Sequence, residues 1–114
     1  MRGLNRSVVV GRVGQDPELR TSKAGVAWCT FSVATDRRRK VGEEWVDDTD
    51  WHRIKVFGRD AEACHRFVRR GSMIGVEGSM NYDKWTDDEG QKRMTPALLA
   101  DRVSFLTDLR EAQV

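Results

Sequence analysis

The chain has 114 residues, of which 39% are hydrophobic and 33% are charged, and it contains only 2 prolines. This size and composition predict one soluble globular domain and exclude disordered, collagen-like and ordinary two-domain proteins. The net charge of +2 does not by itself indicate a polyanionic partner, and no apolar run is long enough to predict a membrane span. The first residues lack the apolar stretch of a secretory signal, so we expect a cytoplasmic protein with no membrane partner.

Three strands are predicted in the first half of the chain. The first covers residues 6–14, where a run of valines is closed by glycines. The second covers residues 26–35, where apolar and polar side chains alternate, and its expected core face consists of Ala27, Cys29, Phe31 and Val33. The third covers residues 49–58 and alternates in the same way. The polar residues 36–50 predict a long exposed hairpin connection between the second strand and the third.

One helix and two more strands are predicted in the second half. Residues 60–70 have apolar side chains at helical spacing, with Asp60 expected to cap the first turn and Gly71 to end the helix. Residues 73–85 and 91–105 predict two strands joined by a hairpin.

The predicted order of elements is three strands, one helix and two strands. This is the order of the OB fold, a five-stranded antiparallel barrel with one helix between strands three and four. We therefore predict an all-β OB-fold domain over residues 1–106 and a short C-terminal end over residues 107–114. Cys29 and Cys64 show no CxxC spacing, which favours reduced, buried thiols.

The third predicted strand carries two aromatic and two cationic side chains on one face. If Ile54 and Val56 point into the core, the opposite face holds Trp51, Arg53, Lys55 and Phe57. Unpaired bases offer rings for stacking, worth roughly 1–3 kcal/mol each, and their phosphates attract cations, so this face is typical of a groove for single-stranded nucleic acid. Alternatively, the two aromatics cover a second small cluster under the cationic side chains.

The combination of aromatic and cationic residues recurs along the chain. Lys84 and Trp85 lie at the base of the last hairpin, and Trp45 and Tyr82 are further aromatics expected to be exposed. Trp28 faces away from the core, and either the groove or a subunit interface accounts for it. The four cations at residues 37–40 either follow a phosphate chain, with Arg37 and Arg39 as candidate contacts, or simply face water.

Five segments carry a resemblance to a known family: Val9–Arg20 (VVGRVGQDPELR), Phe31–Thr35 (FSVAT), Thr49–Arg59 (TDWHRIKVFGR), Val76–Gly78 (VEG) and Lys84–Asp87 (KWTD). In their order and spacing they resemble the bacterial single-stranded DNA-binding proteins of the SSB type. The resemblance extends from about residue 4 to residue 106.

The resemblance implies an OB fold, a homotetramer and sequence-tolerant wrapping of single-stranded DNA during replication, repair and recombination, in a cytoplasmic, nucleoid-associated protein. By matched position it implies stacking aromatics at Trp51, Phe57 and Trp85, and a subunit contact at His52. It also implies phosphate contacts at five cations: Arg53, Arg59, Arg70, Lys84 and Arg93. We expect no catalytic residue, no cofactor and no metal ion.

The chain departs from the family pattern in three places. Arg39 stands where the best-known members have their first aromatic, so charge replaces one stacking site or Trp45 takes it over. Asn81 and Asp83 stand where basic residues often precede the Lys84-Trp85 pair. The family's long tail with an acidic tip is not seen, so protein partners recruited through that tip are not carried over. The sequence leaves open a trimmed chain or a variant that works without the tail.

Three other functions are compatible with parts of the sequence. An enzyme would need Mg²⁺ at acidic clusters such as Asp47, Asp48 and Asp50 near His52, or at residues 87–89. A protein-interaction OB module, such as a primosome accessory protein, would use the aromatics against other chains, although charged residues are depleted in the core of such interfaces. Single-stranded RNA is the third possibility, because stacking and phosphate contacts do not distinguish it from DNA.

Overall fold

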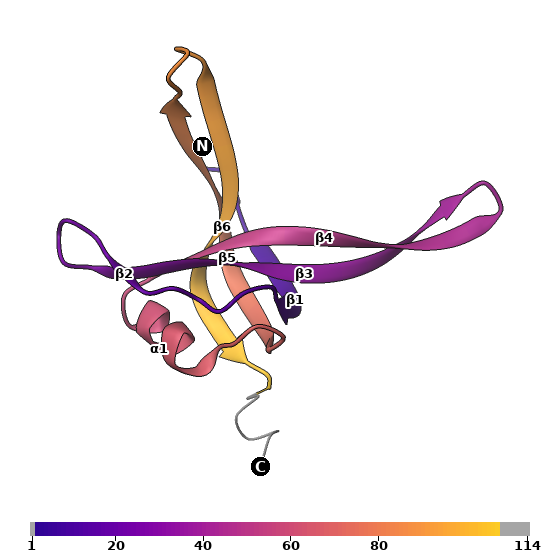
Figure 1. Ribbon diagram of the computed structural model, residues 1–114, viewed down its shortest axis with the longest axis horizontal. Helices are drawn as coiled ribbons and strands as arrows, with labels where there is room; N and C mark the ends of the chain where they lie inside the picture. Colours follow the sequence, from indigo (N-terminus) through magenta and orange to yellow (C-terminus); the bar gives the residue numbers. More distant parts are fainter. Residues whose placement is uncertain (1, 108–114) are drawn as a thin grey trace.

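The computed structural model describes residues 2–107 (Figure 1). Its elements in chain order are β1 (Ser7–Val13), β2 (Arg20–Thr21), β3 (Ala27–Val41), β4 (Glu44–Phe57), α1 (Arg59–Phe67), β5 (Met73–Thr86) and β6 (Lys92–Phe105). No helix in this described range is long and apolar enough to cross a membrane. Of the predicted C-terminal end, residues 108–114 lie outside the described residues.

The strands form one sheet that closes on itself as a barrel. Their order is β1-β5-β6-β4-β3-β2, and an additional pairing between β1 and β3 closes the ring. The prediction of an entirely antiparallel barrel is wrong, because β4 and β6 pair in parallel at Ile54–Leu98 and Lys55–Leu99. The helix α1 lies between β4 and β5, the third and fourth of the five long strands, since β2 is only 2 residues long. A closed five-stranded barrel with one helix is the OB-fold arrangement.

The core is built from the alternating faces of the barrel strands. Cys29, Phe31 and Val33 on β3 and Ile54 and Val56 on β4 are buried, which confirms the predicted core faces apart from Ala27, which is half-buried. The helix α1 covers one end of the barrel (Figure 1) and buries Ala61 and Cys64. Both cysteines are free, buried thiols, as predicted.

The ends of α1 differ from the prediction. Gly58 occupies the N-cap position with a φ of 72°, and no side chain caps the helix there, so the expected role of Asp60 as the cap is wrong. Because φ is positive, the sharp turn from β4 into the helix requires glycine. The helix ends at Phe67, three residues earlier than predicted, and Val68 is already extended. Gly71 does have a positive φ, but it lies in the turn leading to β5.

The polar segment predicted as a connection is a two-stranded ribbon. Strands β3 and β4 pair continuously from Trp28–Phe57 to Val41–Glu44, so that the exposed turn is reduced to residues 42 and 43. Strands β5 and β6 form a second ribbon that ends at the Thr86–Lys92 pair. Both ribbons project from the barrel in different directions (Figure 1). They raise the radius of gyration to 16.4 Å, whereas a compact domain of about 100 residues has about 13 Å.

Candidate nucleic-acid interface

The outward face of β4 lies beside the outward face of β3. Trp51 and Phe57 are 62% and 43% exposed, while Ile54 between them is fully buried. The cross-strand partners of Trp51 and Phe57 are Ala34 and Trp28. Trp28 stacks on Phe57 with ring centroids 6.4 Å apart, so it lies on the same face as the predicted groove.

The first hollow on this face contains Trp51. Its indole ring lies against Gly14, where an added Cβ would be 2.5 Å from Cζ3 of the ring. Arg12 and Arg70 line the same hollow. Arg12 is paired with Ala34 at the end of β1, which brings it beside Trp51. Arg53 lines an adjoining hollow that also includes Trp51. Three arginines from three parts of the chain therefore line the two hollows to which Trp51 belongs.

The second hollow contains Phe57 and Trp28. Lys55 and Lys23 line it together with Thr21 of β2. The ammonium nitrogen of Lys55 lies 5.9 Å from the centroid of the Phe57 ring, within the range of a cation–π contact. The same nitrogen donates a 2.9 Å hydrogen bond to the carboxylate of Asp83 on β5. Lys55 is therefore held over the aromatic ring by a carboxylate from the other ribbon.

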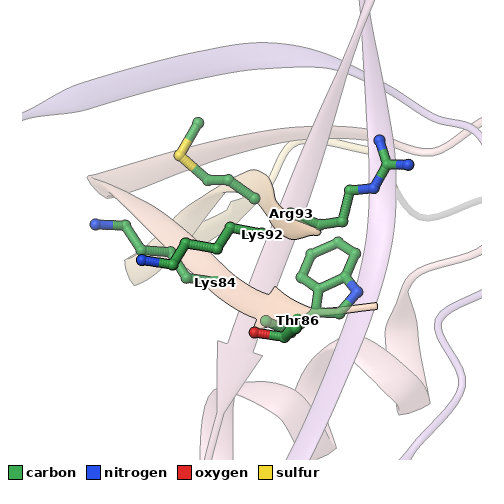
Figure 2. Close-up of a pocket in the computed structure, with 6 residues that line it drawn as sticks. Lys84, Thr86, Lys92 and Arg93 are labelled. Carbon is green, nitrogen blue, oxygen red and sulfur yellow. The ribbon is translucent and has the colours of Figure 1, made fainter. Parts of the chain in front are cut away.

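The third hollow lies on the β5–β6 ribbon and contains Trp85, which is 49% exposed. Its lining comes from both strands: Lys84 and Thr86 on β5, and Lys92, Arg93 and Met94 on β6. Figure 2 shows the ammonium groups of Lys84 and Lys92 pointing to one side of the ribbon and the guanidinium group of Arg93 pointing to the other. Arg93 Nε donates a 2.9 Å hydrogen bond to Asp87.

The predicted contacts Arg37, Arg39 and Trp45 lie far out on the β3–β4 ribbon. Arg37 pairs with Asp50 at 2.9 Å and with Asp48 at 3.4 Å, and Arg39 pairs with the same Asp48 oxygen at 3.2 Å. Trp45 is exposed beside the guanidinium group of Arg38, 5.7 Å from the ring centroid. The cationic run is thus matched by carboxylates from the facing strand.

Of the remaining predicted residues, Arg59 lies apart from these aromatics, whereas His52 lines the adjoining hollow that also includes Trp51 and Arg53. Arg59 is exposed at the start of α1, and it does not line any of the three hollows. His52 is half-buried on the opposite face of β4 from Trp51, and its Nε2 lies 2.8 Å from the hydroxyl oxygen of Thr35.

Four aspartates of the two acidic clusters form ion pairs with arginine: Asp47, Asp48, Asp50 and Asp87. On the β3–β4 ribbon, Asp47 pairs with Arg38 at 3.6 Å, and Asp48 pairs with two arginines. Within residues 2–107, no three acidic, histidine or cysteine side chains come together as a metal site. The hydrogen bond from Arg93, followed by that from the Gln91 N–H, lowers the pKa of Asp87. That carboxylate organises its own hairpin.

Sequence reasoning missed three cations beside the aromatics: Arg12, Lys23 and Lys92. Arg12 and Lys92 occupy strand ends whose neighbours are fixed by pairing between distant segments. Lys23 lies in the turn between β2 and β3. The one signal in the sequence was the alternation of β1, which makes Arg12 point outward because the next residue, Val13, is buried.

Comparison with known proteins decides the family. The profile of the single-strand binding protein family matches residues 4–106. The chain belongs to this family. It is 37% identical over 106 residues to a single-stranded DNA-binding protein of Xylella fastidiosa, a match that covers 92% of this chain and 65% of that protein. The chain therefore spans less than two thirds of the length of this relative.

A solved structure from the same family also shares the fold. The Plasmodium falciparum SSB in complex with ssDNA has a TM-score of 0.84 and 27% sequence identity, over 94% of this chain and 98% of that one. The OB-fold barrel and the predicted family resemblance are thereby confirmed. The family match covers the same range, residues 4–106, that the sequence motifs indicated.

Proposed function

We propose that this protein binds single-stranded DNA without sequence specificity by stacking bases on Trp51, Phe57 and Trp85. Phosphates between the stacked bases contact the neighbouring cations, principally Arg53, Arg70 and Lys84. We add Arg12 and Lys92 to this group because they line the same hollows. Stacking needs only a base face and phosphate contact needs only the backbone, so every base is accepted. Trp45 is a further candidate for stacking, farther out on the β3–β4 ribbon than Trp51 and Phe57. Arg59 is proposed as a phosphate contact only because its position matches that of a phosphate-contacting cation in the family.

One observation carries the proposal: each of the three hollows combines an exposed aromatic ring with at least two cations from different segments. A protein interface seldom places so many charges around its central aromatics. The Plasmodium falciparum relative was solved in complex with ssDNA, which agrees with this assignment. RNA remains the alternative ligand, and the experiment below separates it from DNA.

We further propose that residues 1–106 act as one DNA-binding domain that assembles into a homotetramer in the cytoplasm, associated with the nucleoid. The exposed Val8 and Val10 on the outer side of β1, which also border the two hollows of Trp51, supply an apolar surface for contact between copies. His52 is the proposed contact residue by matched position. In this role the protein coats single strands and protects them during replication, repair and recombination, and no bond is made or broken.

The test is titration of intrinsic tryptophan fluorescence with oligo-dT, oligo-U and duplex DNA, at low and high salt and with EDTA present. Strong quenching by oligo-dT, weaker quenching by oligo-U and little response to duplex are expected. Trp51→Ala should weaken binding to all single strands alike by roughly 1–3 kcal/mol. Equal binding of oligo-U would assign RNA, and no quenching by either single strand would favour a protein-interaction module.

Phe57→Ala has a matched control in Phe67→Ala. Phe67 is 39% exposed, close to the 43% of Phe57, but it lies on α1 against Phe105. Only Phe57→Ala should lower affinity for oligo-dT. Equal affinities of the two variants would show that the β4 face is not the binding face.

A further inference from the structure

Several candidate cations of the interface are already paired with carboxylates of the same chain. Lys55 is paired with Asp83, and Arg37 and Arg39 are both paired with Asp48. By contrast, among residues 2–107, Arg53 and Lys84 have no carboxylate within 4.0 Å. The cations of the proposed binding surface therefore fall into a paired group and an unpaired group.

The β3–β4 ribbon shows this most clearly. Residues 36–50 contain four lysines and arginines and six aspartates and glutamates, a net charge of −2. A phosphate approaching Arg37 or Arg39 meets a surface that the chain's own carboxylates have already neutralised. Counterion release, the main electrostatic gain in binding nucleic acid, depends on cations that are available to phosphate.

The pair between Lys55 and Asp83 has the same effect inside the groove. The two side chains are only 18% and 35% exposed, so solvent screens this pair less than those on the ribbon. Lys55 also lies over the ring of Phe57, where a stacked base is proposed. A phosphate next to that base must compete with Asp83 for the ammonium group. Because Asp83 comes from β5, the competition links the two ribbons.

We propose that Asp48 and Asp83 limit the affinity of this protein for single-stranded DNA by holding Arg39 and Lys55 away from phosphate. This inference rests on the proposed DNA-binding function and assigns two affinity-determining residues to it. The unpaired cations make the phosphate contacts of the wild-type protein. The paired cations can contact phosphate only when their carboxylate partner is removed. A purely structural role for the pairs predicts the opposite result, since their loss would then loosen the ribbon and weaken binding.

The test compares Asp48→Asn and Asp83→Asn with wild type by fluorescence anisotropy of labelled oligo-dT over a range of salt concentrations. Asparagine keeps the shape of aspartate and an acceptor oxygen, and circular dichroism verifies the fold. Each variant should bind about three to ten times more tightly at low salt. The slope of log K against log salt should steepen by about 0.7 for each variant, because Asp83→Asn releases Lys55 and Asp48→Asn releases Arg39, whereas Arg37 keeps its 2.9 Å pair with Asp50.

The matched control is Asp101→Asn. Asp101 is paired with Arg6 at 3.1 Å, both side chains are exposed, and neither lines the three hollows. This variant changes the net charge by the same amount and should leave the slope unchanged. An equal gain in all three variants would show a general charge effect and overturn the proposal.

A second comparison identifies the released cations. Replacing Arg39 by glutamine should abolish the gain in the Asp48→Asn background, because Arg39 has no other carboxylate partner among the described residues. Loss of affinity on Asp48→Asn or Asp83→Asn would overturn the inference while the proposed function stands, provided that wild type binds oligo-dT. Absence of wild-type binding would overturn the proposed function and this inference with it.

Discussion

Replacement of Gly14 by alanine should displace the Trp51 ring without unfolding the barrel. The added methyl carbon would lie 2.5 Å from Cζ3 of Trp51 and 2.7 Å from Oγ of Ser32, both too close for van der Waals contact. Gly14 does not have a positive φ, so alanine brings no backbone strain there. The Trp51 atoms that must move are the far end of an exposed side chain, whereas Ser32 Oγ is short and donates a hydrogen bond to Gln15. The free energy of unfolding should therefore fall by about 1 kcal/mol, the low end of the cost of overpacking.

The effect on DNA binding should be larger than the effect on stability. A ring that is tilted away from its site loses part of the roughly 1–3 kcal/mol that stacking supplies. We expect a loss of about 1–2 kcal/mol, which is about five- to thirtyfold in Kd. Anisotropy with labelled oligo-dT measures the loss, and thermal unfolding monitors the fold. The control is Gly3→Ala, where the methyl group meets open space. Equal affinities of the two alanine variants would refute the placement of Trp51 over Gly14 as a binding position.

Three further predictions concern assembly, pH and thiol reactivity. Val10→Asp places a charge on the exposed outer side of β1 and should reduce the mass measured by sedimentation; an unchanged mass would exclude β1 as a subunit contact. The pKa of Asp87 is lowered in the folded protein, first by Arg93 and then by the Gln91 N–H. This stabilisation is therefore present above the ordinary aspartate pKa and is lost as pH falls through the depressed value. As the pH is lowered through this range, the free energy of unfolding should accordingly fall less for Asp87→Asn than for wild type. Equal decreases would contradict the assignment. Cys29 and Cys64 are both fully buried, and hydrogen bonding with Cys29 and burial raise the pKa of Cys64. Because neither thiol is accessible, a thiol reagent should label neither cysteine until the protein unfolds; labelling on mixing would be inconsistent with this burial.

The core and the aromatic face could be predicted because both follow from alternation within one strand. The period of two separates the buried Phe31 and Val33 from Ser32, and Ile54 and Val56 from the Trp51 face. This rule requires no knowledge of distant contacts.

The ribbon of residues 36–50 could not be predicted from hydrophobicity. Charged residues occupy both faces there, so there is no apolar alternation to indicate a strand. Cross-strand contacts such as those from Arg37 to Asp48 and Asp50 accompany the pairing instead. The parallel pairing of β4 with β6 and the contact between Lys55 and Asp83 depend on barrel closure. Local sequence does not contain that information, and the same holds for the neighbours of Trp51.

The charged ribbon also bears on solubility. Over residues 36–50, each strand of the described structure pairs only with the other, so the outer backbone groups of both strands have no neighbouring strand. Such open edges can add to the sheet of another molecule, and charged side chains along an edge oppose this. The aspartates and arginines that neutralise one another here therefore also protect the ribbon against aggregation. Removing many of these charges to tighten DNA binding would leave an unprotected strand edge that can pair with another molecule. The number of charges that can be removed from the ribbon is therefore limited.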